Sequence, residues 1–361
     1  MHVHQIVSCA GATFISLGVI MTTSCTDREH HLVKQPTVDA DMQKVLDALT
    51  GLHPKPIESL TPTEARQQPS PADAVRVVMR ERGMPVAADP GVSIREMTYP
   101  GGADLQKARI YQPLGVNGTK PVIVYYRGGG WVIASLDIYE ATPVALAKQL
   151  NALVVSVDYR MGPEHKFPAA HDDAIAAYRW VLENAMSWGG DRQRIAVAGE
   201  SAGGNLAANV AIAARDQGLP MPVHQLLIYP VASTNTDSPS YHDCAQAKPL
   251  NAAMMKWFVK NATNSGTDIA DPRLNLIMAN LRGLPPTTII SAEIDPLRSD
   301  GDFLTQSLTT AGVPVEHRLY RGATHEFFGM AAVVDKAREA QEFSVKRLSA
   351  SFENHQEPLA R

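Results

Sequence analysis

The stretch RIAVAGESAGGNLAANV, Arg194 to Val210, decides the fold of this 361-residue chain. It opens with a continuous apolar run typical of a buried parallel strand and closes with the small and apolar residues of a buried helix. Between them lies Gly199–Gly203, with Ser201 at its centre. A serine on a sharp strand-to-helix turn needs glycines two positions to either side, because larger side chains there collide with neighbouring backbone. This context favours a nucleophilic serine over a chance cluster of small residues.

Strand-like and helix-like segments alternate on both sides of this stretch. PVIVYY, ALVVSVDY, HQLLIYP and TTIISAE are short apolar runs, and helical patterns such as HDDAIAAYRWVLENA and GDFLTQSLTTAG separate them. Upstream, SIREMTYP and LQKARIYQP alternate like a half-exposed hairpin. This order predicts a mostly parallel sheet with helices on both faces.

A nucleophilic serine needs a base to take its proton and an acid to orient that base. Asp295 follows the buried run TTIISAEI, and His325 lies in a loop after the strand-like VEHRLYRGAT. The order Ser201, Asp295, His325 is the nucleophile, acid, base order of serine hydrolases built on a parallel sheet. We therefore expect these three side chains to be catalytic.

Other residues compete for these roles. His317 lies inside a predicted strand, and Asp300 and Asp302 fit the first turn of a helix, where the helix dipole favours acidic residues. Asp295 as a turn or capping aspartate, and His325 as a surface-loop histidine, remain the structural alternatives.

Three consecutive glycines, Gly128 to Gly130, follow the strand-like run PVIVYY and precede Trp131. Glycine loses more backbone freedom on folding than any other residue, so three consecutive glycines carry an entropic cost that a structural or functional role must explain. Backbone N–H groups that face a developing oxyanion provide one, because each such donor is worth about 10²–10³ in rate. We expect Gly128 and Gly129 to donate from one side and Ala202 from the other. A phosphate-binding loop is the alternative, but the lysine and spacing of such a loop are missing.

Composition limits the function further. With 33 basic and 37 acidic residues, the net charge is −4, and no block of positive charge is present that would attract nucleic acid. The hydrophobic content of 45% suits one large domain with an accessory piece. Only three cysteines occur, and one, Cys244, lies beyond residue 25, which argues against a disulfide framework.

The amino-terminal 25 residues form a predicted leader. The apolar run from Ile6 to Met21 is too short for a confident spanning helix but has the length of a signal-peptide core. This predicts export to the periplasm or the extracellular space. Cys25 follows a small residue as in a lipoprotein cleavage site, although Thr22 replaces the usual leucine, so lipid anchoring to a membrane is an alternative. A disordered or mistranslated leader is the second alternative to a signal peptide.

The remaining chain divides into three parts. Residues 36–90 contain two amphipathic helical patterns, the second opened by Pro71 and closed by Gly83, and are expected to form a cap. Residues 91–352 are the expected catalytic domain, with a second cap contribution from about residues 233–281. Residues 353–361 are an expected flexible tail.

Five motifs in order, RGGGW, DYRMGPEHKFPAA, GESAGGN, EIDPL and GATHEF, resemble those of the hormone-sensitive-lipase-like esterases, the bacterial family IV of HGGG-type hydrolases. The similarity runs from about Met42 to Ser351. It implies an α/β-hydrolase fold, with a mostly parallel eight-stranded sheet and a helical cap. It also implies hydrolysis of short- to medium-chain acyl esters through an acyl-enzyme, with no metal and no organic cofactor.

The chain departs from the family pattern at two positions. Arg127 stands where the family has histidine, and Glu200 where aspartate is common. Arginine has donors but no acceptor, so it braces the glycine loop only if its partners are carbonyls or carboxylates. We expect an active enzyme in which Arg127→His raises turnover or leaves it unchanged. The DYRMGPEH segment, which includes Asp158, Tyr159 and Arg160, is expected to form a structural network.

The substrate is expected to be a small-molecule ester. The residues expected to line its pocket are Trp131, Glu200, Met254, Trp257 and Phe258. For the four hydrophobic residues, packing in the core is the alternative, because hydrophobic spacing does not separate these roles. Two other functions stay open: a catalytically silent binding protein on the same fold, and an amidase or deacetylase, because fold and triad do not fix the leaving group. A homodimer is also left open.

Overall fold

The computed structural model describes residues 36–87, 89–264 and 266–355. The predicted leader and its Cys25 lie outside these ranges. None of the helices within them combines the length and apolar character needed to span a bilayer.

An eight-stranded sheet forms the centre of the fold, in the order β1-β2-β4-β3-β5-β6-β7-β8. β1 pairs antiparallel with β2, and β2 antiparallel with β4, while all the other pairs are parallel. The predicted hairpin and the predicted mostly parallel sheet are both confirmed. The strands are β1 Val92–Pro100, β2 Leu105–Pro113, β3 Lys120–Tyr126, β4 Leu153–Val157, β5 Gly190–Glu200, β6 Gln225–Ile228, β7 Thr287–Ile294 and β8 Val315–Thr324.

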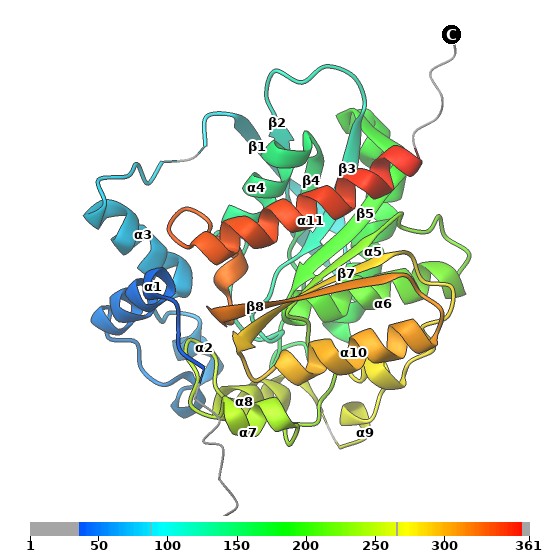
Figure 1. Cartoon of the computed structure of the whole chain (residues 1–361). Coiled ribbons are helices and arrows are strands. Elements are labelled where there is room, and N and C mark those ends of the chain that lie inside the picture. Colours follow the sequence, from blue (N-terminus) through cyan, green and yellow to red (C-terminus); the bar gives the residue numbers. More distant parts are fainter. Residues whose placement is uncertain (1–35, 88, 265, 356–361) are drawn as a thin grey trace, which may run out of the picture. The chain divides into compact units, whose positions relative to one another are not determined.

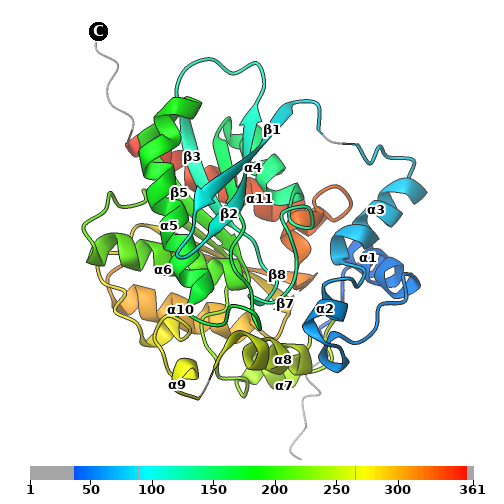
Figure 2. The same cartoon turned by 180° about the vertical axis from the view of Figure 1, so that it is seen from behind.

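Helices cover both faces of the sheet, as Figures 1 and 2 show. The side chains of β3 alternate between them, because successive residues of a strand point to opposite faces. Val122 and Val124 belong to the core under α5, α6 and α10, whereas Ile123 and Tyr125 belong to the core under α4 and α11. These helices are α4 Ala141–Leu150, α5 Ala169–Asn184, α6 Ala202–Asp216, α10 Arg298–Thr310 and α11 Asp335–Asn354, with short 3-10 turns η2 Ala185–Trp188 and η4 Phe327–Met330.

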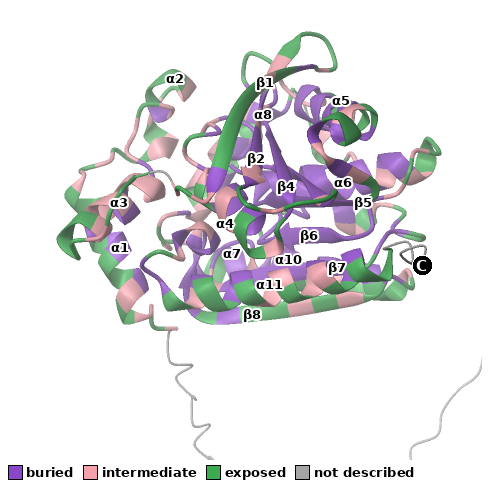
Figure 3. Ribbon diagram, turned by 90° about the horizontal axis from the view of Figure 1, so that it is seen from above, coloured by how far each residue is buried: buried purple, intermediate pink, exposed green. Residues whose placement is uncertain are grey.

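Burial follows the position of each strand in the sheet. The residues of β4 and β6 are all buried, whereas most residues of β1, at the edge, are exposed (Figure 3). Strands covered on both faces are apolar along their whole length, which is why their sequences read as continuous apolar runs.

Two helical segments lie outside the sheet in the regions expected to form a cap, and they are called the first and second cap segments. The first contains α1 Ala40–Gly51, η1 Ile57–Ser59, α2 Pro62–Ala65 and α3 Pro71–Glu81. The second contains α7 Pro239–Asp243, α8 Ala252–Ala262, α9 Gly266–Ile269 and η3 Leu276–Met278. They touch each other: the Trp257 indole N–H of α8 donates to the Leu60 carbonyl at 3.1 Å, and α2 lies beside α8 in Figures 1 and 2.

In the first cap segment, helix α3 begins and ends where the sequence indicates. Ser70 caps α3 through a reciprocal pair of hydrogen bonds with Asp73, and Pro71 occupies the first helical position. Gly83, at φ +67°, follows the last turn in the left-handed conformation that glycine adopts readily. At the other end of the chain, α11 continues to Asn354, into the predicted tail.

Candidate active site

The carboxyl ends of the parallel strands bring distant residues together. Tyr126 of β3 pairs with Gly199 of β5, so the glycine loop and Ser201 leave the sheet at the same edge. Ile294, the last residue of β7, pairs with Thr324, the last residue of β8. Asp295 directly follows β7, and His325 directly follows β8. In open parallel sheets this edge is where ligands bind.

Ser201 lies on a strained turn between β5 and α6. Its φ of 56° and ψ of −119° are unusual for a residue with a Cβ atom. The turn is tight enough to exclude larger neighbours: a Cβ on Gly199 would lie 2.1 Å from the Gly203 carbonyl oxygen, and one on Gly203 would lie 2.0 Å from that of Tyr126. Both glycines are therefore required by space, as the sequence pattern indicates.

A continuous chain of contacts joins the three predicted catalytic side chains. His325 Nε2 lies 3.0 Å from Ser201 Oγ, and His325 Nδ1 lies 2.6 Å from Asp295 Oδ2. All three residues are buried. Asp295 is fixed in turn, because its Oδ1 accepts the Leu297 N–H at 2.9 Å. The carboxylate therefore holds the imidazole with Nε2 directed at the hydroxyl.

The charges around His325 favour its protonated form. Burial by itself lowers the pKa of the imidazole, but the Asp295 carboxylate and its hydrogen bond outweigh this, with smaller contributions from Glu326 and Glu200, so the pKa lies above its ordinary value. An imidazole with a raised pKa accepts a proton from a neighbouring hydroxyl more readily.

The competing residues have other partners. Asp300 accepts the Ala232 and Ser233 amides, both at 2.9 Å, and His317 contacts Ser291 Oγ at 2.9 Å. Neither contacts Ser201. Within the described part of the chain, no cluster of His, Cys, Asp or Glu has the makings of a metal site.

The glycine loop forms one wall of a cavity next to Ser201. Gly129 and Gly130 line this cavity, whereas Gly128 does not. Gly129 and Gly130 have φ values of +104° and +58°. Neither amide, nor that of Ala202, has a hydrogen-bond acceptor among the described residues. Donors of this kind remain available to a ligand.

Arg127, fully buried, holds the glycine loop in place. Its Nε and Nη2 donate to Asp158 Oδ1 at 3.0 and 2.5 Å, and its Nη1 donates to the carbonyls of Gly128 and Ile133 at 3.1 and 3.0 Å. The guanidinium also lies over the Tyr159 ring, 4.3 Å from its centroid. The partners are thus the carbonyls and the carboxylate that a side chain without acceptors requires.

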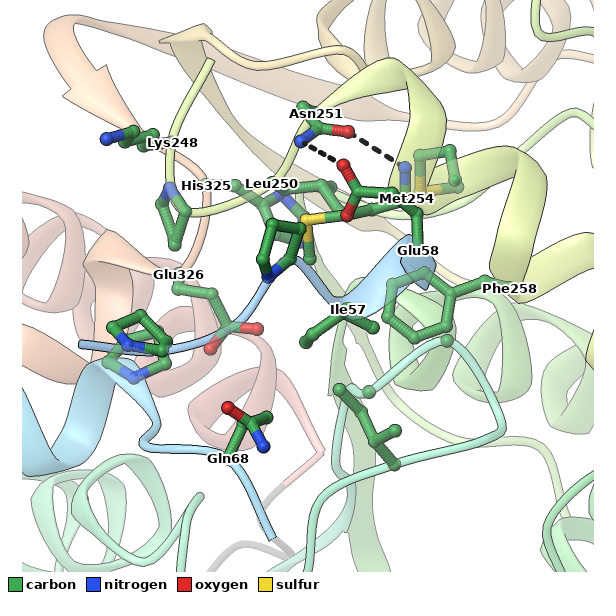
Figure 4. Close-up of a pocket in the computed structure, with 18 of the residues that line it drawn as sticks. Ile57, Glu58, Gln68, Lys248, Leu250, Asn251, Met254, Phe258, His325 and Glu326 are labelled. Carbon is green, nitrogen blue, oxygen red and sulfur yellow. Dashed lines mark hydrogen bonds between the residues drawn. The ribbon is translucent and has the colours of Figure 1, made fainter. Parts of the chain in front are cut away.

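The cavity has a volume of about 570 Å³ and lies between the two cap segments and the sheet edge. Figure 4 shows Ile57 and Glu58 of the first cap segment facing Leu250, Met254 and Phe258 of the second, with His325 to one side. Asn251 caps α8 at its Met254 amide and contacts Glu58, which links the two segments across the cavity.

Three of the five predicted pocket residues line this cavity: Trp131, Met254 and Phe258. The prediction is wrong for the other two. Trp257 is turned toward the Leu60 carbonyl. Glu200 is buried below the serine, where its carboxyl accepts hydrogen bonds from Tyr125, Thr142 and Tyr229, and burial raises its pKa.

Two residues beside His325 are not among the sequence-based predictions. The Tyr229 ring lies 4.5 Å from the imidazole, centroid to centroid, and its hydroxyl donates to Glu200. Glu326 follows His325 directly and lines the same cavity. Tyr229 ends a strand-like run and looked like core, and Glu326 carries no sequence signal beyond its position next to the histidine.

The sheet order, Ser201 at a strand-to-helix turn, and Asp295 and His325 directly after β7 and β8 form the arrangement of an α/β hydrolase. Residues 123–329 match the family model described as the alpha/beta hydrolase fold.

Known proteins narrow the family further. The chain is 43% identical over 278 residues to the carboxylesterase NlhH of Mycobacterium tuberculosis, covering 74% of this chain and 87% of that protein. It is 38% identical over 316 residues to the esterase LipI of the same organism, covering 85% and 93%. Among solved structures, an esterase from Pseudomonas putida superimposes with a TM-score of 0.78 at 31% identity, covering 90% of this chain and 99% of that one.

The chain therefore belongs to the hormone-sensitive-lipase-like carboxylesterases of the α/β-hydrolase fold, and it is a carboxylic ester hydrolase.

Proposed function

We propose that this chain hydrolyses short- to medium-chain acyl esters through an acyl-enzyme, with Ser201 as nucleophile, His325 as general base and acid, and Asp295 as the residue that orients the imidazole. The observation that carries this proposal is the contact chain from Asp295 through His325 to Ser201 beside a cavity.

In the first half-reaction, Ser201 Oγ attacks the ester carbonyl carbon while its proton passes to His325 Nε2. The tetrahedral intermediate collapses, the bond to the leaving oxygen breaks, and the imidazolium returns the proton to the departing alcohol. In the second half-reaction, a water gives its proton to Nε2 and attacks the acyl-enzyme, and the acid leaves as Ser201 regains its proton. Asp295 stabilises the imidazolium in both.

The negative charge on the carbonyl oxygen is stabilised by backbone N–H groups. We assign this role to Gly129 and Gly130, with the Ala202 amide on the opposite side, because the two glycines line the cavity and all three amides lack acceptors among the described residues. Gly130 in place of Gly128 is the one change to the sequence-based expectation. Donors of this kind cost nothing to reorganise during the reaction, which is why they accelerate it.

The cavity supports a small or medium acyl ester. Its volume lies within the range of about 300–1,000 Å³ typical of small-molecule sites. Much of its wall is apolar, with Ile57, Ile133, Val231, Met255 and Phe258 among the residues that would contact an acyl chain. Two related proteins bear the names ethyl acetate hydrolase and arylesterase, which also fits a small substrate.

Hydrolysis of a p-nitrophenyl ester series from acetate to dodecanoate tests the function. We expect kcat/KM to be highest between acetate and octanoate, and Ser201→Ala, His325→Ala and Asp295→Asn to lower kcat by about 10⁴-fold or more while the proteins stay folded. A folded Ser201→Ala variant with wild-type activity would contradict the proposed nucleophile, and an optimum at dodecanoate would contradict the proposed chain length.

We also propose, from the sequence alone, that the chain is exported and loses its leader. Mass spectrometry of the amino terminus after expression in a bacterial host measures this directly. A processed chain supports export, and a diacylglyceryl adduct on Cys25 would show lipid anchoring; an intact leader on all molecules refutes it.

A further inference from the structure

Glu326 occupies a position that the ester-hydrolysis mechanism above does not use. It follows His325 in the chain, adopts a left-handed conformation with φ 69°, and lines the ester cavity. It also lines a second cavity of about 490 Å³ between α3, α4 and the segment after η4. Pro71 and Glu326 line both cavities, so the carboxyl group forms part of the wall between them.

One carboxylate oxygen of Glu326 is held by a tyrosine from the loop that carries the glycine run. Tyr139 donates its hydroxyl to Glu326 Oε1. The same hydroxyl packs directly on the glycine loop, since a Cβ built on Gly128 would lie 2.3 Å from Tyr139 Oη. The histidine loop and the glycine loop come from opposite parts of the sequence, and Glu326 and Tyr139 connect them.

The other oxygen, Oε2, has no hydrogen-bond donor among the described residues, and Glu326 is only half-buried. Its exposed part faces the cavities that it lines. The carboxyl group is therefore accessible from these cavities even though it lies beside a buried imidazole.

We propose that Glu326 is a positioning residue of the hydrolytic site: through Tyr139 it connects the histidine loop to the glycine loop, and its negative charge stabilises the protonated His325 that forms in each half-reaction. This inference rests on the proposed function, because it assigns Glu326 a role only if His325 cycles between its neutral and protonated forms.

The surrounding charges allow Glu326 this role. Burial raises the pKa of Glu326 to about 6, while His325 and the Tyr139 hydrogen bond oppose the rise, so the carboxyl group is largely ionised above neutral pH. Other groups face the same region. His325 itself contacts Asp295 and Tyr229. The ionisable residues that line the two cavities or lie below them are His53, Lys55, Glu58, Arg76, Asp89, Asp137, Glu140, Lys148, Glu200 and Lys248.

Several of these charges are already neutralised by a partner: Arg76 pairs with Asp73 at 2.6 Å, Lys148 with Asp89 at 2.7 Å, and Arg109 with Glu140 at 3.3 Å. Glu200 is shielded by three hydroxyl donors. Besides Asp295, Glu326 is thus the carboxylate with the most direct influence on the imidazole.

The pH dependence of kcat/KM for p-nitrophenyl acetate tests the proposal. Glu326→Gln keeps the size of the side chain and an acceptor for Tyr139 but removes the charge. We expect its acidic limb, which reports the protonation of free-enzyme His325, to move to lower pH by about half a unit to one unit. We expect its plateau to fall about 3- to 10-fold, because the imidazolium loses part of its stabilisation. Glu326→Met, a second neutral variant, should move the limb in the same direction.

Two further variants separate charge from structure. Tyr139→Phe keeps the Glu326 charge but breaks the connection between the loops, so kcat should fall several-fold while the limb moves less than in Glu326→Gln. Glu140→Gln removes a carboxylate from the wall of the second cavity, and its limb and plateau should match those of the wild type. Thermal unfolding of each variant checks that it is folded.

The outcomes distinguish this inference from the proposed function. If the wild type does not hydrolyse the ester, or Ser201→Ala hydrolyses it equally well, the proposed function fails and this inference fails with it. If hydrolysis depends on Ser201 but both neutral Glu326 variants keep the wild-type limb and plateau, only the role of Glu326 is overturned. A wild-type kcat in Tyr139→Phe would overturn the connection between the two loops.

Discussion

Replacing Arg127 with methionine tests how the glycine loop is held. Methionine fills much of the same space but has no donor for Asp158 or for the carbonyls of Gly128 and Ile133. Breaking a buried ion pair by removing one partner costs about 3–5 kcal/mol. The Asp158 side chain is 27% exposed and regains some hydration in the variant, which puts the expected cost near the lower end, about 3 kcal/mol.

The same change should also slow the reaction. The Gly128 carbonyl keeps one donor, the Tyr159 hydroxyl at 3.1 Å, but the Ile133 carbonyl loses the guanidinium. Ile133 is bonded back to Gly129 through its amide at 2.9 Å, so its displacement moves the amides assigned to the oxyanion. Misplacing one such donor lowers kcat by about 10²-fold.

Guanidinium chloride unfolding followed by tryptophan fluorescence, together with kcat for p-nitrophenyl butyrate, measures both effects. Arg347→Met is the control, because Arg347 pairs with Glu316 near the start of β8, at the opposite end of that strand from His325; we expect its kcat to be unchanged and its stability to fall by less than about 1 kcal/mol. Wild-type stability and kcat in Arg127→Met would refute the bracing role.

The contacts of Arg127 also reverse one expectation drawn from the sequence. A histidine at this position is too short to contact Asp158 and two carbonyls together, so Arg127→His should lower turnover rather than raise it. Retained turnover in Arg127→His would show that the backbone alone positions the loop.

Three further predictions concern single groups. Gly130→Ala should lower kcat at least tenfold, because a Cβ at this position would lie 2.3 Å from the Phe258 ring at a φ of +58°. Gly312 also has a positive φ, but no atom lies within 4 Å of a Cβ built there, so Gly312→Ala should lower stability and leave kcat unchanged. Equal kcat in the two variants would argue against the loop geometry. The acidic limb of wild-type kcat/KM should lie above pH 6.5, because Asp295 outweighs burial in raising the His325 pKa and the base must be neutral; a limb below pH 6 contradicts this. Burial raises the pKa of Asp300 to about 7, above its unfolded value of about 4, so the contribution of Asp300 to stability falls as the pH rises between these values. The Tm of Asp300→Asn should therefore increase relative to that of the wild type from pH 5 to pH 8. A constant difference in Tm would show that Asp300 is ionised throughout.

The sequence predicts the sheet well because buried parallel strands leave a direct signal. β4 and β6 are apolar along their whole length since both faces are covered, and Gly199 and Gly203 are required by the turn around Ser201. Ser201, Asp295 and His325 each directly follow a predicted strand, so their order along the chain is the order of β5, β7 and β8.

The details of the cavity leave no such signal. Trp257 and Phe258 are neighbours on α8, and only the orientation of the helix decides their roles. Phe258 lines the cavity, whereas Trp257 contacts the first cap segment. Glu200 is adjacent to Ser201 in the chain, but its carboxyl group is buried and accepts hydrogen bonds from three hydroxyl groups instead of lining the ester cavity. The choice of Gly130 over Gly128 depends on φ values and on the Tyr139 hydroxyl, both of which are set by tertiary packing.

Covalent labelling with a fluorophosphonate, read as intact and peptide mass, measures the reactivity of the serine most directly. The geometry around His325 predicts a single adduct on Ser201 in the wild type, no adduct in Ser201→Ala, and much slower labelling in His325→Gln. A folded wild-type protein that takes up no label, or takes it up on another residue, would contradict the account.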